Sequence, residues 1–356
     1  MEIHQVVATA RPGDAVTNLA LEYRELLRRI GPSEIVAEYR DPAIEHEVRD
    51  LDWYRRRPSS PSDLVLYHAS IGAAALVDLL LARRERIGVV YHNVTPAEWF
   101  KNWSPVLERL CREGREELAL LLRRAVLAVA VSEFNAAELA GLGGPPPRVV
   151  PPVLDPARLA RVEPDPAVAA ALAARPGPHF VHVAQVLPHK RPEQLVQAFH
   201  LLVTHLHPTA TLAIVGSTHL APFVAAVERQ VAELGLDGCA LLGTVDDPTL
   251  AAHLRRADAF VTASEHEGFC VPLLEAMALD TPAVAKAVAA VPETAGGAAL
   301  LLPPDAGPAL LAEAMAMMAE RPEVSAAFVR AGRERLAEVA AADPRAALLE
   351  ALAEVV

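Results

Sequence analysis

Two glutamates that can bind a polar ligand stand eight positions apart in residues 262–286, which read TASEHEGFCVPLLEAMALDTPAVAK. Glu267 is followed by Gly268, and glycine allows a sharp turn or the close approach of a ligand to the backbone. Pro272 suits the first turn of a helix, where a missing N–H leaves no hydrogen bond unmade. A carboxylate in a loop before a helix N-terminus favours a ligand that carries both hydroxyl groups and negative charge.

The elements that must position these glutamates are a buried strand and a helix. Residues 259–262 (AFVT) are typical of a buried strand, and apolar residues recur at helical spacing after Pro272. Glu275 therefore falls in or near the first turn of that helix. Because doubly wound α/β sheets place ligands at the carboxyl ends of their strands, we expect the Glu267 loop to lie at such an edge.

The order of residues in this stretch resembles the donor-site signature of glycosyltransferase family four, the retaining nucleotide-sugar enzymes of the GT-B fold. The resemblance implies that Glu267 binds sugar hydroxyls and orients the ring, and that Glu275 holds the ribose hydroxyls. It also implies a donor-site lining of Gly268, Phe269, Cys270 and Val271. The matching positions are Ser264, Glu267, Gly268, Phe269, Pro272, Glu275, Ala276, Met277, Ala278, Thr281 and Pro282.

Two positions depart from the family pattern, because Cys270 and Asp280 stand where the family usually has glycine. We expect Cys270 to crowd the backbone face that the sugar approaches. Asp280 is the milder change, since Asp tolerates the left-handed conformation better than most residues.

A basic loop precedes another helix of the second half. Residues 180–184 read as a strand, and Lys190 lies just before a helix that starts at Pro192, where an ammonium and the helix dipole can both face a departing diphosphate. The loop resembles the arginine-then-lysine pair of family four, but Gln185 occupies the arginine position. Either Arg191 supplies the missing charge or Lys190 acts alone.

Two further turns of the second half are donor-site candidates. Gly216 ends the strand predicted over 211–215, and Val245 follows the strand predicted over 239–242. The resemblance places the Val245 turn under the nucleotide base.

The N-terminal half offers three candidates, each after a predicted strand. Gly13 follows the strand over 3–8; the resemblance places this loop beside the donor diphosphate and the acceptor, but an ordinary βα turn is an equal alternative. His92 ends the strand over 87–91 and resembles the histidine that the family places beside the transferred sugar. As a neutral or charged donor it would bind a sugar hydroxyl or stabilise the transition state; a capping or packing role is the alternative. His68 has the same placement and would line the cleft.

Trp99, Phe100 and Trp103 cluster before an arginine-rich helix over 106–124. Packing in the core or between domains, an acceptor-binding lip and contact with a membrane interface all fit this cluster. Residues 37–61, by contrast, are charged and contain prolines, and we expect an exposed connection there.

Length, charge and cysteine content limit the number of domains, the classes of partner and the compartment that we expect. A length of 356 residues indicates about two domains. A net charge of −12 argues against a general nucleic-acid binder. Three cysteines without paired spacing indicate a reducing cytoplasm, with peripheral contact at the inner membrane face as a further reading. We expect no signal segment, no membrane-spanning run, no cofactor and no metal, because the histidines at 200, 205, 207 and 219 form no ligand set and no Asp-x-Asp pair is suitably placed.

The sequence thus predicts an α/β GT-B protein with two Rossmann-like, doubly wound domains facing each other across a cleft. The Gly- and Pro-rich residues 141–166 mark the linker. We expect an acceptor-binding domain over 1–160, a donor domain over 161–335 and a C-terminal helix, 336–356, that packs back on the first domain.

The predicted activity is the retaining, metal-independent transfer of a hexosyl-type sugar from a nucleotide-diphosphate sugar to a hydroxyl of a glycan, a lipid-linked acceptor or a small molecule. A nucleotide-sugar epimerase of the same fold and a non-catalytic nucleotide-sugar-binding protein stay open, as does a partner-binding protein. A hydrolase in which the two glutamates act as paired catalytic carboxylates is a less favoured alternative. The donor base, the sugar, the acceptor and the oligomeric state are not indicated by the sequence.

Overall fold

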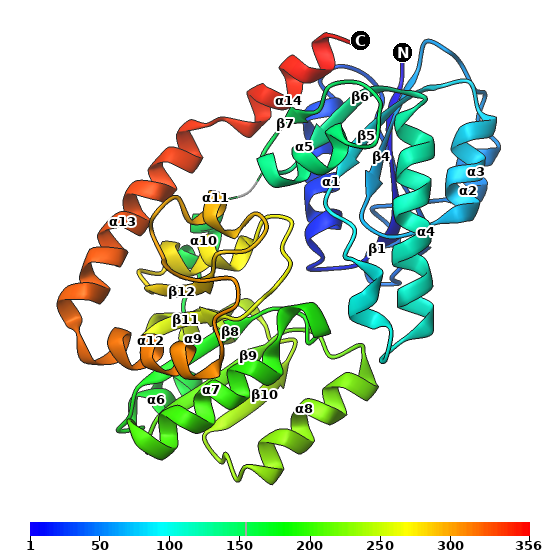
Figure 1. The fold of residues 1–356 in the computed structure, drawn as a ribbon. Coiled ribbons are helices and arrows are strands. Elements are labelled where there is room, and N and C mark those ends of the chain that lie inside the picture. Colours follow the sequence, from blue (N-terminus) through cyan, green and yellow to red (C-terminus); the bar gives the residue numbers. More distant parts are fainter. Residues whose placement is uncertain (154) are drawn as a thin grey trace. The chain divides into compact units, whose positions relative to one another are not determined.

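The computed structural model describes residues 1–153 and 155–356, and its chain forms two compact units. The first unit comprises Met1–Leu154 and Asp343–Val356, and the second comprises Asp155–Ala342 (Figure 1). Each unit contains one parallel sheet with helices around it, as the sequence predicts.

The first sheet has seven strands in the order β3-β2-β1-β4-β5-β6-β7, and its paired strands run parallel. Strands at its centre, such as β4 and β6, are largely apolar and buried, as expected for strands covered on both faces, whereas the edge strand β3 consists only of Arg49 and Asp50. The strands are β1 (Ile3–Ala10), β2 (Ile35–Arg40), β3 (Arg49–Asp50), β4 (Leu64–Ala69), β5 (Arg86–Tyr91), β6 (Ala125–Ala130) and β7 (Arg148–Val149).

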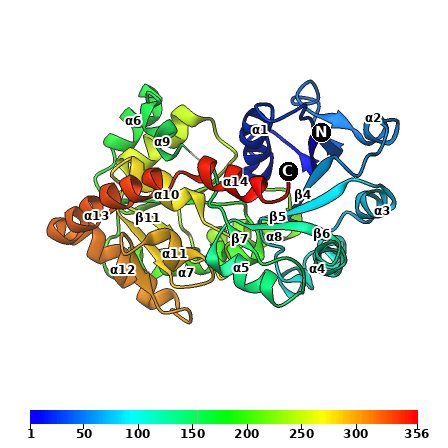
Figure 2. The same cartoon turned by 90° about the horizontal axis from the view of Figure 1, so that it is seen from above.

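Helices cover both faces of this sheet, because right-handed crossovers in opposite directions place them on opposite sides. Figure 2 shows α1 on one side of the strands and α3 and α4 on the other. The helices are α1 (Ala15–Leu27), α2 (Leu51–Arg55), α3 (Ala74–Ala82), η1 (Ala97–Phe100), α4 (Pro105–Leu122), α5 (Glu133–Ala140) and α14 (Pro344–Ala353). The expectation of an exposed connection over 37–61 is wrong, since the end of β2, β3 and α2 lie there and Ile44, Val48 and Tyr54 are buried.

The second sheet has six strands in the order β10-β9-β8-β11-β12-β13, and its paired strands also run parallel. The strands are β8 (His179–Val183), β9 (Thr211–Val215), β10 (Cys239–Gly243), β11 (Ala259–Thr262), β12 (Ala283–Lys286) and β13 (Leu300–Leu302). The helices are η2 (Pro156–Arg161), α6 (Pro166–Ala173), η3 (Pro188–Lys190), α7 (Pro192–His205), α8 (Ala221–Glu233), α9 (Asp247–Arg256), α10 (Val271–Ala278), α11 (Val291–Ala295), α12 (Pro308–Glu320) and α13 (Pro322–Ala341).

The boundaries between the units differ from the predicted 160/161 and 335/336. The first boundary lies earlier because η2 packs on α10, and its Leu159 is part of the second unit's core. The second lies later because α13 packs on α10 and α12. Residues from Asp343 onward belong to the first unit, where Leu348 and Leu352 of α14 pack into its core.

Each sheet has one point where the strand order reverses. In the second sheet the chain builds β9 and β10 on one side of β8 and then returns to β11 on the other side. The loops after β8 and β11 therefore diverge at the carboxyl ends of adjacent strands, which is where open α/β sheets bind ligands. In the first sheet the same reversal lies between β1 and β4.

Candidate functional site

Lys190 and Glu267 meet at the switch point of the second sheet. Lys190 is the last residue of η3, in the loop after β8, and Glu267 lies in the loop after β11. Lys190 Nζ lies 2.7 Å from Glu267 Oε2, and the two side chains are only 16% and 10% exposed. The backbone N–H of Glu265 also donates to the carbonyl of His189 at 2.8 Å, which ties the two loops together. Lys190 and Glu267, which were predicted separately from two distant segments, thus lie next to each other in the structure.

A second ionic cluster lies beside this pair and was not foreseen. Lys286, at the end of β12, is 1% exposed and places its Nζ 3.2 Å from Glu265 Oε1 and 2.7 Å from Gln194 Oε1. Arg191 Nε lies 3.0 Å from Glu193 Oε1 and 3.3 Å from Glu265 Oε1. Because two carboxylates already face the Arg191 guanidinium, the geometry favours Lys190 over Arg191 as the phosphate-facing charge. Gln185, at the family's arginine position, is exposed.

His182 is a buried neighbour of the Lys190–Glu267 pair that sequence reasoning missed. Its Nδ1 lies 2.9 Å from the carbonyl of Val261, which can only accept, so Nδ1 carries the proton and Nε2 a lone pair. Within the described part of the chain, Nε2 has no hydrogen-bond partner. Burial lowers the pKa of His182 to about 4, and the nearby Lys190 charge acts in the same direction. A histidine inside an apolar strand reads as core, so no sequence signal distinguishes it.

Glu275 lies on α10, just beyond its first turn, because the helix begins at Val271. The carboxylate is half-buried, and burial raises its pKa while the charge of Arg158 opposes that shift. Arg158 is paired with Asp247, so both charges lie near Glu275. The position suits a carboxylate that accepts hydrogen bonds from hydroxyl groups.

The two departures from the family pattern both adopt left-handed backbone conformations. Cys270 has φ +75° and Asp280 has φ +57°, where glycine would be unstrained. The Cys270 side chain is buried in the hydrophobic core of the second unit, which argues against the expected crowding of the sugar-facing surface. Asp280 also forms a bidentate ion pair with Arg333, with both contacts at 2.7 Å, and so joins the end of α10 to α13.

The remaining donor-site candidates line turns of the same sheet. Gly216 has φ +144°, and a Cβ there would lie 1.9 Å from the carbonyl oxygen of Ala184, so only glycine fits. Val245 is half-buried and packs against the core. Gly268, Phe269 and Val271 are also half-buried, between Glu267 and α10.

In the first unit, His92 follows β5 and contacts His68 of β4. His92 Nε2 lies 2.8 Å from His68 Nδ1, and His68 Nε2 lies 2.9 Å from Gln5 Oε1. Burial lowers the pKa of His92 to about 4 and that of His68 well below its usual value. His68 is fully buried, so the expectation that it lines a cleft is wrong. Gly13, in the loop after β1, has φ +74° and open space around its Cβ position.

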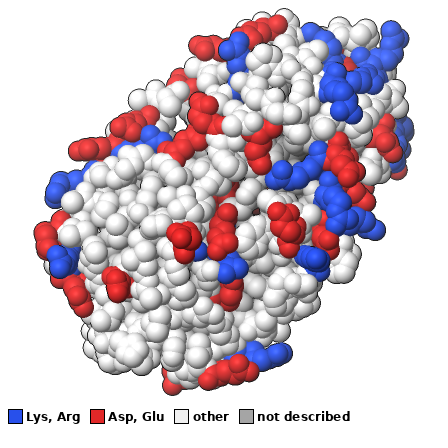
Figure 3. Space-filling model, viewed as in Figure 1, with Lys and Arg blue, Asp and Glu red and all other residues white. Residues whose placement is uncertain are grey.

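The aromatic cluster is mainly packed. Phe100 is buried, and Trp99 and Trp103 are half-buried. Arginines of α4 pair with glutamates one turn away, at 2.6 Å for Arg112 with Glu108 and 3.7 Å for Arg109 with Glu113. In Figure 3, basic and acidic side chains lie next to each other at several places, mainly toward the right-hand side of the face shown. These contacts favour packing over a basic membrane-binding surface.

Within the described residues, no helix is long and apolar enough to span a membrane. No group of three or more metal-ligating side chains is found among them either.

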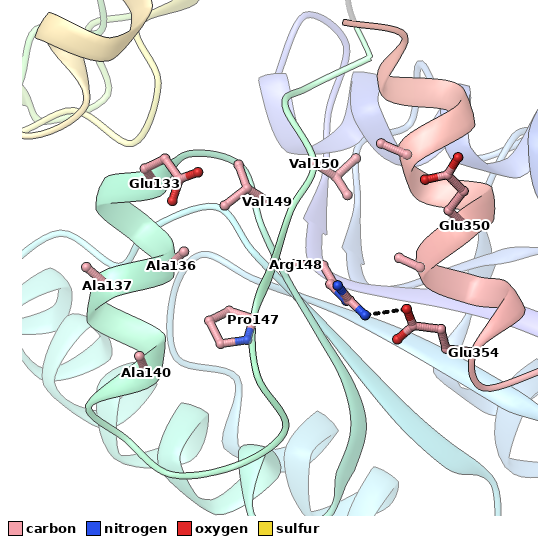
Figure 4. A pocket seen from close by; sticks show the side chains of 12 residues that line it. Glu133, Ala136, Ala137, Ala140, Pro147, Arg148, Val149, Val150, Glu350 and Glu354 are labelled. Carbon is pink, nitrogen blue, oxygen red and sulfur yellow. Dashed lines mark hydrogen bonds and ion pairs between the residues drawn. The ribbon is translucent and has the colours of Figure 1, made fainter.

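A hollow of about 620 Å³ lies elsewhere in the first unit, between α5, β7 and α14. Figure 4 shows that small side chains such as Ala136 and Ala140 line one wall, and that an ion pair joins Arg148 to Glu354 across the hollow. None of the predicted site residues lines it, and it holds no catalytic constellation.

Residues 170–335 match the protein family described as "Glycosyl transferases group 1". That match covers most of the second unit, including Lys190, Glu267 and Glu275. No curated protein matches the chain at a significant level.

Solved structures of glycosyltransferases share the fold over nearly the whole chain. HepE from Anabaena, in complex with UDP and glucose, superposes with a TM-score of 0.76 at 17% identity over 100% of both chains. Sucrose-phosphate synthase from Thermosynechococcus elongatus superposes with a TM-score of 0.71 at 20% identity, and the match covers 95% of this chain and 94% of the synthase chain. A trehalose-6-phosphate structure from E. coli, bound with UDP-2-fluoro glucose, superposes with a TM-score of 0.71 at 13% identity. The match covers 99% of this chain and 98% of the E. coli chain. The predicted GT-B fold is therefore confirmed.

Proposed function

We propose that the protein transfers a sugar from a nucleotide-diphosphate sugar to an acceptor hydroxyl with retention of configuration. The match of residues 170–335 to the group 1 glycosyl transferases supports this proposal, in line with the resemblance to family four. The observation that carries this proposal is the Lys190–Glu267 pair at the switch point of the second sheet. Proteins of similar fold have been solved in complex with UDP, with UDP and glucose, or with UDP-2-fluoro glucose, so a UDP-hexose is the first donor to test. The acceptor class extends to glycans, lipid-linked sugars and small molecules.

The proposed chemistry requires charge stabilisation of the departing diphosphate. Lys190 provides an ammonium beside the N-terminus of α7, and the loop after β11 leads into the N-terminus of α10. An ammonium and helix amides act strongly on developing negative charge in a site shielded from water. These groups supply positive charge without a metal ion, and we propose metal-independent transfer for that reason.

Glu267 and Glu275 are proposed to bind opposite ends of the donor. A diphosphate near Lys190 competes with Glu267 for the ammonium, which leaves the carboxylate oxygens of Glu267 to accept hydrogen bonds from sugar hydroxyls. Glu275, farther along α10, is proposed to accept from the ribose hydroxyls. The N–H groups and carbonyls of the turns at Gly216 and Val245 are proposed to border the base and phosphates.

His92 is proposed to act as a neutral group. Its lowered pKa, about 4, keeps the imidazole uncharged at pH 7. Its Nε2 is already engaged with His68, so its other nitrogen is the one available to a sugar hydroxyl. The charged form considered from the sequence is disfavoured by this environment.

The decisive experiment incubates the full chain with UDP-, GDP- and ADP-hexoses and an acceptor panel, with and without EDTA, and follows the products by NMR. We expect a new glycoside with the anomeric configuration of the donor and no loss of activity in EDTA. Conversion of the donor to an isomer without acceptor would instead identify an epimerase. Donor binding without any turnover would identify a non-catalytic binder.

A further inference from the structure

A chain of hydrogen bonds crosses the core of the first unit and ends at His92. It begins at the backbone carbonyl of Ala20 on α1, which lies 2.8 Å from Gln5 Nε2 on β1. Gln5 Oε1 lies 2.9 Å from His68 Nε2 on β4, and His68 Nδ1 lies 2.8 Å from His92 Nε2 after β5. Gln5 and His68 are both fully buried, so water does not compete for these contacts.

The direction of every bond in the chain follows from its first member. A backbone carbonyl only accepts, so Gln5 must turn its NH₂ group to Ala20 and its oxygen to His68. That oxygen also only accepts, so His68 must carry its proton on Nε2 and present a lone pair at Nδ1. His92 must then donate from Nε2, which leaves its Nδ1 without a proton.

The surroundings keep this arrangement in its neutral form. Burial lowers the pKa of both histidines, so neither ring takes up a second proton at neutral pH. The two rings stack with centroids 5.1 Å apart, and the ring of Tyr23 packs against His68 at 5.9 Å. The Tyr23 hydroxyl has no hydrogen-bond partner in the described residues, so Tyr23 packs against His68 but is not part of the row of hydrogen bonds.

We propose that Gln5 and His68 are positioning residues that fix His92 in the Nε2–H tautomer, so that its Nδ1 accepts a hydrogen bond from a hydroxyl of the bound sugar or acceptor. This inference rests on the proposed function for the role of His92, but the tautomer itself is a property of the free chain. A neutral imidazole has one donor and one acceptor nitrogen, and its partner decides which is which. An unpositioned His92 would divide between two tautomers, and only one of them presents an acceptor at Nδ1.

The tautomer is measured directly in the full chain, labelled with ¹⁵N-histidine, by long-range ¹H–¹⁵N correlation of the rings. A His92→Gln spectrum assigns the signal. We expect wild-type His92 to show a protonated Nε2 and an unprotonated Nδ1 at pH 7. A protonated Nδ1 would overturn the proposal.

Three variants of the chain separate positioning from packing. His68→Leu removes the acceptor, and we expect a mixture of His92 tautomers with kcat reduced roughly 10-fold and donor KM little changed. Gln5→Leu removes the oxygen that fixes the proton of His68 on Nε2, and it is expected to give a similar mixture of His92 tautomers and a similar loss of rate. Tyr23→Phe, the packing control, is expected to alter neither. An unchanged tautomer in His68→Leu would overturn the inference, whereas full transfer activity in His92→Gln would speak against the proposed role of His92 and leave the tautomer result standing.

Discussion

Lys190 and Glu267 depend on each other, because each is largely removed from water and each neutralises the other at 2.7 Å. Removing one partner of such a pair leaves the other as a buried charge, which usually costs more than the pair itself contributes. The same two groups are the ones we assign to the diphosphate and the sugar. Stability and activity are therefore coupled at this pair.

We predict that Lys190→Met and Glu267→Gln each lower transfer by well over ~10-fold, the scale of one lost charge-assisted contact in a transition state. Each single variant should also lose roughly 1–3 kcal/mol of stability, and the double variant less than the sum, because it leaves no unpaired charge. Urea titration and initial rates measure both effects. Arg112→Met, which breaks the exposed pair with Glu108, is the matched control and should change neither by more than experimental error. Wild-type rates in both single variants would refute the site assignment.

In the second unit, the residues predicted from the sequence stand in loops after strands or near the start of a helix, whereas polar residues within or at the end of strands were not predicted. Lys190, Glu267 and Glu275 occupy a distinctive spacing next to turns and helix starts. His182 and Lys286 sit within or at the end of apolar runs, where a polar residue carries no signal until the neighbouring strand is known. Glu265 lies in the same stretch as Glu267, but its contacts to Lys286 and Arg191 are made with other elements and were not predictable from the stretch itself.

The site depends on the elements that hold its two loops, and one contact between elements is especially close. The turn after β9 packs against the backbone after β8, the segment that leads to Lys190. Gly216 makes this approach possible, since a Cβ there would meet the Ala184 carbonyl oxygen at 1.9 Å. Its amide also donates to the carbonyl of Gly243, the last residue of β10, at 2.9 Å. The turn therefore connects three strands at the edge that carries the site.

We predict that Gly216→Ala destabilises the second unit by at least about 3 kcal/mol, because backbone strain and a clash with backbone are combined. The matched control is Gly235→Ala, where φ is +63° but no atom lies within 4 Å of the Cβ position. That control should lower the free energy of unfolding by only about 1 kcal/mol, the cost of placing an alanine in the left-handed conformation. Chemical denaturation followed by circular dichroism compares the two variants, because the three tryptophans all lie in the first unit and do not report on the second. Equal losses would show that the close approach at Gly216 does not matter.

Strand positions were largely predictable, but the assignment of boundary elements was not. The predicted strands over 211–215 and 259–262 coincide with β9 and β11, because each is a short apolar run followed by small or polar residues. The Gly- and Pro-rich linker was visible in composition. That η2 packs on α10, and that α13 stays with the second unit, depends on which apolar faces find a partner, and the local sequence does not specify that partner.

Across the whole molecule, several histidines are buried in neutral form. Burial lowers the pKa of His92 and His182 to about 4 and that of His179 to about 3. In the unfolded chain these groups titrate near 6.5. The contribution of these neutral histidines to stability is thus fully present above pH 6.5. It is lost as the pH falls toward 4, since the unfolded chain then binds protons that the folded chain does not.

We predict that the free energy of unfolding declines between pH 6.5 and pH 4, by up to roughly 1.4 kcal/mol for each histidine and each unit of pKa difference. Buried carboxyls such as Glu275, whose pKa is raised, act in the opposite direction and reduce the net slope. Urea midpoints at several pH values test this. His179→Asn should flatten the curve, whereas His46→Gln, at a side chain that is 73% exposed, should leave it unchanged. A rise in stability toward pH 4.5 would contradict the neutral, buried state of these histidines.

The most direct test of the central claim is the calorimetric affinity of UDP, GDP and ADP for the wild-type chain, for Lys190→Met and for the Arg112→Met control at one fixed salt concentration. The account predicts that one nucleotide binds the wild type and the control equally, and that Lys190→Met weakens it by about 10-fold or more, since a charge-assisted phosphate contact is lost. Equal affinity in Lys190→Met, or no binding of any nucleoside diphosphate to the wild type, would contradict it.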